Sequence, residues 1–425
     1  MSKIASVRGM NDLAPEEVRL WNVAEETIKK VFNSYGYEEI RFPIIEKTEL
    51  FSRSNESADI VTKEMYTFED KGGDSISLRP EGTAGCVRSA IDNDLIRIDS
   101  PRLWYQGPMF RYERPQKGRS RQFHQSSAEA FGIRSAHIDA ELIILSSRIW
   151  KELGVESTIN LEINNIGDER TRQSYAEALQ DYFKSYEKEL DEDSQRKLNE
   201  NPLRILDSKS ESIRSLLNNA PDISDFIPED SKAEFSELIH VLEDAEIQFS
   251  LNTKLVRGLD YYNQTVYEWK SGLLGAQDTV CGGGRYDNLV EELGGKPCPA
   301  TGFSIGMERL ILLMKETLEI NLDNKNIDLF FVCLSKEGIQ KAIMYSESLR
   351  EKASELGIKI NMGLESAGSQ FKKADKSGAM FAVILGDDEL QNNTISLKDL
   401  RSKADQETLS YEDLEKRIEK TYKLD

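Results

Sequence analysis

The sequence predicts an α+β domain that is interrupted by a helical insertion and followed by a separate α/β domain. Helical and strand-like patterns mix over residues 1–320, and residues 168–247 within them are rich in charged side chains with only weak helical periodicity. Strands alternate with helices over residues 327–425, beyond a polar segment at 321–326 that we expect to be a linker. A chain of 425 residues is also long enough for two or three domains.

The first domain is expected to open with a helix of about twenty residues that begins at Pro15, because apolar residues recur at helical spacing there. Asp12 is available as its cap, and Gly36 is available to end it. The run EEIRFPII that follows is predicted to be a strand, and Pro43 restricts that strand to an edge or interface position.

Two hairpins come next. TKEMYTFED and SISLRP pair across Gly72 and Gly73, ahead of a helix that opens near Glu81. Leu103 to Arg111 and Arg121 to Phe131 then form a second hairpin, since both runs are rich in aromatic residues. Alternation along the second of these strands predicts one shared face for Arg121, Phe123, Gln125, Ser127 and Glu129.

The first domain resumes after the insertion, because β-rich sequence brackets the polar stretch. TINLEINNIG precedes it, FSLNTKLVRGLDYYNQTVYEW and DTVCGGGRYD follow it, and a helix from near Met307 ends the domain. In the last domain, IDLFFVCL, IKINMG and AMFAVILG read as strands separated by a helix to Leu356 and another near Phe371. We expect a mostly parallel sheet there.

Composition limits the possible functions. The formal net charge of -20 argues against indiscriminate binding to phosphate backbones, so any nucleic-acid contact must use local basic patches. The N-terminus has no apolar segment of the kind that directs secretion, which favours a cytoplasmic protein that does not enter membranes. No C-x-x-C pair occurs, so we expect neither a zinc site nor disulfides among four cysteines, Cys86, Cys281, Cys298 and Cys333.

The segment from Arg111 to Phe131 is the most informative part of the chain. It places five Arg or Lys side chains around the turn-forming Pro115 and Gly118 inside an acidic protein, an arrangement suited to holding an anion. Taken alone, it is equally compatible with a surface hairpin whose tip is solvated. A second basic patch, FKKADKSGA at 371–379, would more often be only a solvated helix face.

Five co-linear motifs together resemble one family, the histidyl-tRNA synthetases. FRYERPQKGRSRQFHQ at 110–125 and GFSIGMERL at 302–310 resemble motifs 2 and 3 of the class II aminoacyl-tRNA synthetases. LVRGLDYY at 255–262 resembles a signature confined to the histidyl enzymes and their close relatives, and RPEGTAGCVR at 79–88 and CGGGRYD at 281–287 fit the same family. The resemblance covers nearly the whole chain.

The resemblance implies a class II catalytic domain built on an antiparallel sheet and a C-terminal anticodon-binding domain. It implies activation of L-histidine with ATP to histidyl-adenylate and pyrophosphate, then transfer to the 3′ end of histidine tRNA. ATP would bind together with Mg2+, and no tightly bound cofactor is implied. The motifs do not identify any protein side chain as a ligand of the metal. A homodimer is implied, because motif 1, carried by the first helix and the Pro43 strand, forms the interface in the family.

The resemblance also assigns the ATP site. Arg111 bridges the substrate carboxylate and the α-phosphate, Arg257 contacts the α-phosphate, and these two are the catalytic residues. Arginine suits this task, because its planar, permanently charged fork can hold a phosphate bidentately. The remaining ATP contacts are Arg309 on the phosphates, Phe123 stacked on the adenine, Arg119 on the triphosphate and Glu113 on the adenine amino group. Phe123 as an ordinary core residue stays an alternative.

For histidine, Glu129 and Tyr262 match the family's imidazole contacts, and Tyr261 lies beside the pocket. Glu81, Thr83 and Gln125 match the positions that hold the α-amino group, although Glu81 could equally be a carboxylate at a helix N-terminus. Gln116 resembles the position that contacts the tRNA acceptor end. No general base is evident, since His124 has the opposite strand parity to Gln125 and is expected to be structural. Catalysis by positioning and electrostatics is therefore favoured.

Two other functions remain open. The first is a catalytically silent paralogue, the regulatory subunit of an ATP phosphoribosyltransferase, which generally lacks the C-terminal domain and the signature arginines. The second is a histidine-sensing or RNA-binding module that keeps the fold without turnover.

Overall fold

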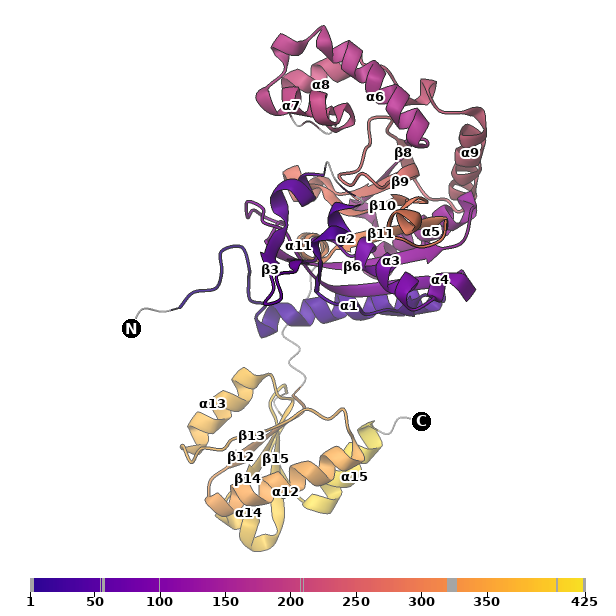
Figure 1. Ribbon diagram of the computed structural model, residues 1–425. Helices are drawn as coiled ribbons and strands as arrows, with labels where there is room; N and C mark the ends of the chain where they lie inside the picture. The colour runs from indigo at the N-terminus through magenta and orange to yellow at the C-terminus, as the bar shows by residue number, and fades with distance from the viewer. Residues whose placement is uncertain are drawn as a thin grey trace. The chain divides into compact units, whose positions relative to one another are not determined.

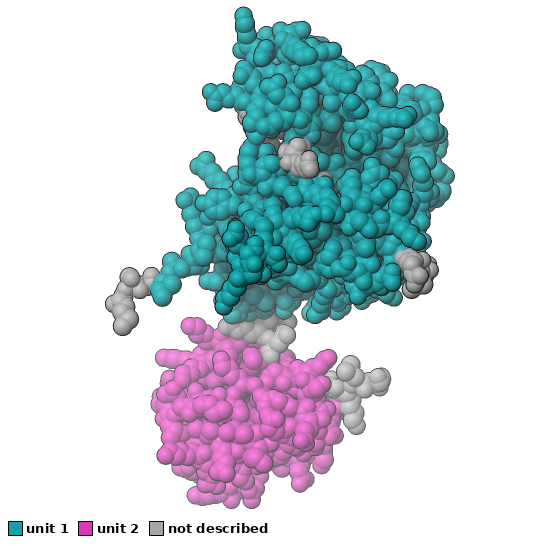
Figure 2. All heavy atoms as spheres, viewed as in Figure 1, with its two compact units in different colours: residues 1–319 teal, residues 320–425 magenta. Residues whose placement is uncertain are grey.

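The computed structural model describes residues 4–422 except 54, 56–57, 99, 207, 209, 319–326 and 403. The predicted linker at 321–326 therefore lies outside the described residues. The chain forms two compact units, residues 1–319 and 320–425, shown in different colours in Figure 2. Within the described residues, no helix is long and apolar enough to cross a lipid bilayer.

An eight-stranded sheet organises the first unit, in the order β1-β5-β6-β11-β10-β9-β7-β8. Its six central strands, from β5 to β7, pair antiparallel with one another, whereas β1 on β5 and β8 on β7 run parallel at the two edges. The predicted antiparallel sheet is thus confirmed. The strands are β1 (Glu38–Glu39), β5 (Arg102–Phe110), β6 (Gln122–Phe131), β7 (Asn160–Asn165), β8 (Phe249–Leu251), β9 (Asn263–Lys270), β10 (Thr279–Arg285) and β11 (Ala300–Gly306).

Two long helices, α1 (Pro15–Ser34) and α5 (Ala136–Glu152), cover one face of this sheet (Figure 1). Phe32 of α1 packs 5.5 Å from the ring of Trp104 on β5, and Trp150 of α5 packs 6.1 Å from Trp269 on β9. The predicted first helix is confirmed, but its predicted cap is wrong. Ala14 precedes the helix without a side-chain cap, and Pro15 supplies the helical φ instead of Asp12 supplying a hydrogen bond.

The predicted strand EEIRFPII is split in two. Glu38–Glu39 joins the main sheet, while β2 (Ile45–Lys47) pairs with β4 (Ser75–Leu78) in a separate three-stranded sheet completed by β3 (Tyr66–Glu69). Pro43 lies between the pieces, where the lack of an N–H prevents one continuous ladder. The predicted hairpin across Gly72 and Gly73 is β3–β4, and the helix predicted near Glu81 is α3 (Thr83–Asp92).

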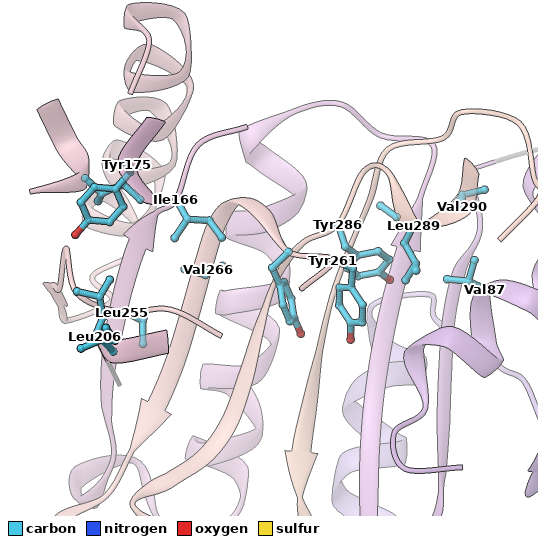
Figure 3. Packing of buried hydrophobic residues seen from close by; sticks show 14 of the residues in the cluster. Val87, Ile166, Tyr175, Leu206, Leu255, Tyr261, Val266, Tyr286, Leu289 and Val290 are labelled. Carbon is cyan, nitrogen blue, oxygen red and sulfur yellow. The ribbon is translucent and has the colours of Figure 1, made fainter. Parts of the chain in front are cut away.

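The insertion is helical, as predicted. It contains α6 (Glu169–Lys184), α7 (Glu192–Glu200), α8 (Glu211–Leu217) and α9 (Glu229–Asp244), with short 3-10 turns at Glu187–Glu189, Pro202–Ile205 and Ile223–Asp225. Its buried residues, among them Tyr175 and Leu206, belong to the same apolar cluster as Val87 of α3 and Tyr286 after β10 (Figure 3). The insertion therefore shares a core with the rest of the first unit.

Shorter elements complete the first unit. They are α2 (Thr48–Ser52), a π-helical turn (Ile60–Glu64), α4 (Leu95–Ile98), 3-10 turns at Glu156–Thr158 and Gly272–Gln277, α10 (Leu289–Glu292) and α11 (Met307–Thr317). The last of these is the helix predicted from near Met307.

The second unit has a five-stranded sheet in the order β13-β12-β14-β15-β16. Its strands are β12 (Leu329–Cys333), β13 (Ile358–Ile360), β14 (Phe381–Leu385), β15 (Thr394–Asp399) and β16 (Glu407–Ser410), and its helices are α12 (Lys336–Lys352), α13 (Ala367–Ser377), α14 (Asp387–Asn392) and α15 (Tyr411–Tyr422). The first three strands in spatial order are parallel, but β15 and β16 extend the sheet antiparallel. The expectation of a mostly parallel sheet is therefore wrong: the sheet is mixed, because the chain reverses direction after β14, first through α14 and again between β15 and β16.

Candidate active site

Small residues and a few polar side chains share the sheet face opposite α1 and α5. Glu129 of β6 pairs with Gly302 of β11, and Gly302 in turn pairs with Gly284 of β10. One step along, Ser127 aligns with Ser304 and Gly282. A Cβ at Gly302 would collide with the Glu129 carboxylate. The glycines therefore lower the floor of the sheet, and larger polar side chains lie above it.

A cavity of about 240 Å³ opens on this face and brings together the residues assigned to ATP. The residues that line it come from the β5–β6 hairpin, from β10, from α11 and from the loop that precedes β9. Seven predicted residues line it: Arg111, Glu113, Arg119, Phe123, Gln125, Arg257 and Arg309. Side chains nearly 200 positions apart in sequence therefore share one chamber.

The cations in this cavity are only partly neutralised. Among the described residues, the Arg309 guanidinium donates to three neutral oxygens, of Gly118 (3.2 Å), Thr279 (2.6 Å) and Gln277 (3.1 Å). Burial, followed by repulsion from Arg119 and Arg111, lowers the pKa of Arg309 to about 10. Burial also lowers the pKa of Arg111, and Arg257 adds to that effect. Such a cluster is stabilised by a bound anion.

Arg257 is fixed more firmly than the other arginines. It pairs with Glu268 of β9, and its guanidinium lies 5.5 Å from the ring centroid of Tyr262. Burial alone would lower the pKa of Arg257, but the Glu268 charge together with Tyr262 and Tyr261 outweighs it, and the pKa is raised. A Cβ at Gly282 would collide with the guanidinium, so the strand beneath Arg257 must carry a glycine.

The β5–β6 hairpin supplies the other side of the cavity. Arg111 donates to the carbonyl of Pro80 at 2.8 Å and lies 5.0 Å from the ring centroid of Phe123. Arg119 pairs with Glu113, whose side chain is buried. Phe123 lines the cavity and also packs against the apolar core. Its position is therefore compatible both with stacking on a ligand and with a role as a core residue.

Two residues of the hairpin lie elsewhere. The prediction that Arg121 shares the face of Phe123 is wrong: β6 begins at Gln122, and the Arg121 guanidinium stacks 3.8 Å from the ring centroid of Tyr112. Gln116 is exposed at the tip, where its backbone exchanges two hydrogen bonds with Arg119 (3.0 and 2.9 Å) across a turn that Gly118 makes with φ +73°. It lies outside the cavity lining.

A second group of residues surrounds Glu129, deeper on the same face. Glu129 is 1% exposed and accepts hydrogen bonds from the hydroxyls of Thr83 (2.9 Å), Tyr105 (2.9 Å) and Tyr286 (2.5 Å). Burial, only partly offset by these hydrogen bonds, raises the pKa of Glu129 to about 8. Thr83 therefore contacts Glu129 here, whereas the family resemblance assigns it to the α-amino group of the substrate.

The remaining predicted residues lie around Glu129. Glu81 accepts from the backbone N–H groups of Thr83 (2.6 Å) and Ala84 (2.9 Å), the geometry of the helix N-terminus alternative, and burial raises its pKa. Gln125 has a buried amide oxygen with no hydrogen-bond partner among the described residues. Tyr261 and Tyr262 pack 4.8 Å apart and burial raises the pKa of both.

Three functional neighbours were missed: Tyr105, Tyr286 and Glu268. Tyr286 stands in the motif CGGGRYD, and Figure 3 shows it beside Tyr261, with ring centroids 5.7 Å apart. Strand alternation could have found Tyr105 and Glu268, since Tyr105 pairs with Ser127 and Glu268 with Gly282. The register between those strands cannot be read from any one segment, so the partners of the two residues were not evident.

His124 lies on the opposite face, as its parity predicts. Its ring packs edge-on at 5.0 Å from Trp21 of α1, and its Nδ1 lies 3.0 Å from Glu308. These contacts fit a structural role.

Both units of the chain match known protein families. Residues 9–310 match the family described as histidyl-tRNA synthetase, and residues 328–421 match the anticodon binding domain. The structure is similar to apo histidyl-tRNA synthetase from S. aureus, with 35% sequence identity, a TM-score of 0.81, and coverage of 98% of this chain and 100% of that chain.

Two more distant structures share the fold. Histidyl-tRNA synthetase from a Nostoc species is 23% identical with a TM-score of 0.69, over 99% of this chain and 100% of that one. A Bacillus halodurans protein titled ATP phosphoribosyltransferase regulatory subunit/histidyl-tRNA synthetase is 22% identical with a TM-score of 0.64, over 88% of this chain and 97% of that one. From the family match and the 35% identical structure together, the chain belongs to the histidyl-tRNA synthetase family.

Proposed function

We propose that the arginine-lined cavity and the Glu129 pocket together carry out the histidine–tRNA ligase reaction of this family. In this reaction L-histidine and ATP first give histidyl-adenylate and pyrophosphate, and the histidyl group then passes to the 3′ end of histidine tRNA. One observation carries the residue assignment: Arg111, Arg257 and Arg309 converge on a single cavity.

In the first step a histidine carboxylate oxygen attacks the α-phosphorus, and the bond to the β-phosphate oxygen breaks. Negative charge grows on the phosphoryl oxygens, so fixed cations are the main requirement. Arg111 and Arg257 are the residues proposed for the α-phosphate, while Arg309 and Arg119 are proposed for the outer phosphates. Phe123 is proposed to stack on the adenine, and Glu113 is proposed to accept a hydrogen bond from the adenine amino group.

Magnesium enters as part of the ATP substrate, since its β and γ oxygens are hard ligands for the ion. The acidic lining residues Glu113, Glu268 and Glu308 are compatible with a hydrated cation nearby. Within the described part of the chain, no cluster of three or more acidic, His or Cys side chains could hold a metal by itself.

Histidine is proposed to bind beside Glu129, its imidazole facing Glu129 and Tyr262, with Tyr261 alongside. The unpartnered amide oxygen of Gln125 is suited to the α-ammonium group, since a buried acceptor without a donor is costly. Glu81 and Thr83 would share that role. Glu81 would then attract the α-ammonium group through its charge while it still accepts the hydrogen bonds from the backbone at the start of α3.

Transfer RNA is proposed to meet three surfaces. Gln116 and the exposed hairpin tip would contact the acceptor end, and the insertion, residues 168–247, would contact the acceptor arm by analogy with the family. In the second unit, α13 exposes Lys372 and Lys373 on a face suited to the anticodon stem and loop. The last proton is proposed to pass to a phosphate or tRNA oxygen.

A cytoplasmic homodimer is proposed, with the three-stranded sheet in its interface. The apolar residues of that sheet share one face, because Ile45 pairs with Leu78 and Phe68 with Ile76 at matching parity. Ile45 is 46% exposed and Phe68 45% exposed. Such a patch is typical of a surface that another subunit covers.

The decisive test is ATP–pyrophosphate exchange measured with each of the twenty amino acids. Exchange that depends on histidine alone is the expected result, because a pocket that pairs both ends of a polar substrate rejects analogues by about 10⁴ to 10⁵. The retained arginines and the anticodon-binding unit also distinguish the chain from a silent regulatory paralogue. Histidine binding without exchange would instead support a sensing module.

A further inference from the structure

Three hydroxyl groups occupy most of the acceptor capacity of Glu129. An ionised carboxylate offers about four acceptor positions. Thr83 and Tyr105 fill both positions on Oε1, and Tyr286 fills one on Oε2. One position on Oε2 is therefore left for a ligand. A neutral imidazole carries one ring N–H, so the number of donors that the ligand offers matches the number of acceptor positions that remain.

The same hydroxyls determine the ionisation state of the pocket. Tyr105 and Tyr286 are 2% and 1% exposed, so their hydroxyls cannot turn to water instead. Their hydrogen bonds lower the pKa of Glu129 against the larger effect of burial and against repulsion from Glu81. Other titratable groups that face Glu129 are Cys86 of α3 and Tyr261 and Tyr262 of the loop before β9, and burial raises the pKa of each.

We propose that Tyr105 and Tyr286 are positioning residues that favour the ionised form of Glu129 and fix its orientation, and so set both the affinity for histidine and the acid limit of its recognition. This inference rests on the proposed contact between Glu129 and the imidazole. Neither tyrosine needs to touch the reacting atoms. Each acts through the carboxylate, since a protonated Glu129 would offer a donor where the ring N–H also needs an acceptor.

The test uses the full chain with Tyr286→Phe and Tyr105→Phe, which keep the buried rings and remove one hydroxyl each. Histidine-dependent ATP–pyrophosphate exchange is measured from about pH 6 to 9. We expect the KM for histidine to rise about tenfold or more, because a hydrogen bond to a charged group is lost. The KM for ATP and the kcat at saturating histidine should stay within about twofold. The acid limb of kcat/KM should move to higher pH.

Tyr267→Phe is the matched control. Tyr267 of β9 is also fully buried, but it lies on the opposite face of the sheet, and its hydroxyl has no hydrogen-bond partner among the described residues. Its removal should leave both the KM and the pH profile unchanged. Glu129→Gln is the second arm, and it should abolish the acid limb except for the titration of free histidine near about pH 6.5.

Wild-type KM and pH profile in both tyrosine variants would overturn the inference, as would equal losses in the KM for ATP, the KM for histidine and kcat. An acid limb that persists in Glu129→Gln, above the titration of histidine itself, would assign the limb to another group and reject the proposal. A wild-type chain that shows no exchange with histidine would instead refute the proposed function. The two failures are thus separable.

Discussion

Arg257 shows how one side chain can be held ready for an anion. Glu268 keeps it charged, Tyr262 packs beside it, and Gly282 leaves the space that its guanidinium fills. Glu268 in turn accepts from Thr279 at 3.0 Å and lies 3.3 Å from Lys270. Because Glu268 also interacts with Thr279 and Lys270, it does not fully neutralise Arg257, and the guanidinium can still interact with a phosphate.

Arg257→Ala should therefore nearly abolish adenylate formation, with kcat falling by about 10² to 10³, the usual cost of removing a preorganised transition-state donor. Glu268 keeps Thr279 and Lys270 as partners, so the fold should survive. Pyrophosphate exchange and thermal unfolding measure the two effects. Arg102→Ala is the control, since Arg102 pairs with Glu141 at 3.2 Å outside the cavity lining. Normal exchange in Arg257→Ala would refute the assigned role.

The raised pKa of Glu129 predicts how stability changes with pH. The ordinary value is 4.5 and the folded value is about 8, so between them the folded state binds more protons than the unfolded state. The contribution of Glu129 to folding stability is then greatest at low pH and is lost as the pH rises toward 8.

Glu129→Gln removes this dependence. Relative to wild type, the variant should gain stability between pH 5 and 8.5, on the order of a few kcal/mol. Denaturant unfolding of both proteins without ligand at the two pH values measures the difference. A gap between the variants that does not change with pH would show that Glu129 titrates near its ordinary pKa.

At the scale of elements, β10 and β11 serve as a floor with few side chains. Gly282→Ala should reduce exchange strongly while leaving the sheet folded, because the new methyl group displaces the Arg257 guanidinium rather than backbone. We expect a loss of about tenfold or more, since small displacements of a positioning group are costly.

Gly272→Ala is the matched control for this prediction. A Cβ at Gly272 meets no atom within 4 Å, and the residue lies in the same unit. Exchange kinetics on the two variants separate a clash at Arg257 from a general effect of replacing glycine. Equal activity would mean that Arg257 can move without consequence.

Much of this arrangement could be predicted, because local patterns carried it. Aromatic-rich runs identified β5 and β6, alternation placed Phe123 and Glu129 on one face, and helical spacing located α1. Features that depend on pairing between distant strands could not be read in this way. The roles of Tyr105, Tyr286 and Glu268 follow from a register that no single segment encodes.

The corrected features have similar causes. Asp12 had the right residue type for a cap, yet the chain enters α1 through Ala14 and Pro15. The strands β15 and β16 run antiparallel to their neighbours, although the alternation of strand and helix predicted parallel pairing. Local preference was overridden in each case by the way the chain packs.

At the scale of the molecule, the separate C-terminal unit predicts a selective loss when it is removed. Deleting residues 325–425 should leave histidine activation within about twofold, since the whole cavity lies in the first unit. Aminoacylation of tRNA should fall by about 10² or more, because one of two linked binding surfaces is gone. Parallel assays of both half-reactions on a folded truncation decide this. An equal loss of both would argue against a dedicated anticodon unit.

The proposed dimer makes a second prediction at this scale. Phe68→Glu places a charge on the apolar face of the three-stranded sheet and should shift the protein from dimer to monomer, since charges are costly within an interface. Sedimentation velocity measures the change. Leu251→Glu is the control, because Leu251 is 61% exposed on the edge strand β8, away from that sheet. A dimer that persists in Phe68→Glu would locate the contact elsewhere.

The continuous apolar cluster beneath the insertion restricts how this enzyme could be shortened. Asp222 of the insertion accepts from Thr253 at 2.6 Å, and Arg204 donates to Asp260 at 2.7 Å, so the stretch that carries Arg257 is braced from both ends by the inserted helices. Deleting residues 168–247 and joining the flanking residues would remove the helices that pack against the segment carrying Arg257. It would also expose Ile166 and Val266 to water. Trimming for a minimal catalyst of histidine activation has to begin somewhere else, beyond the end of α11.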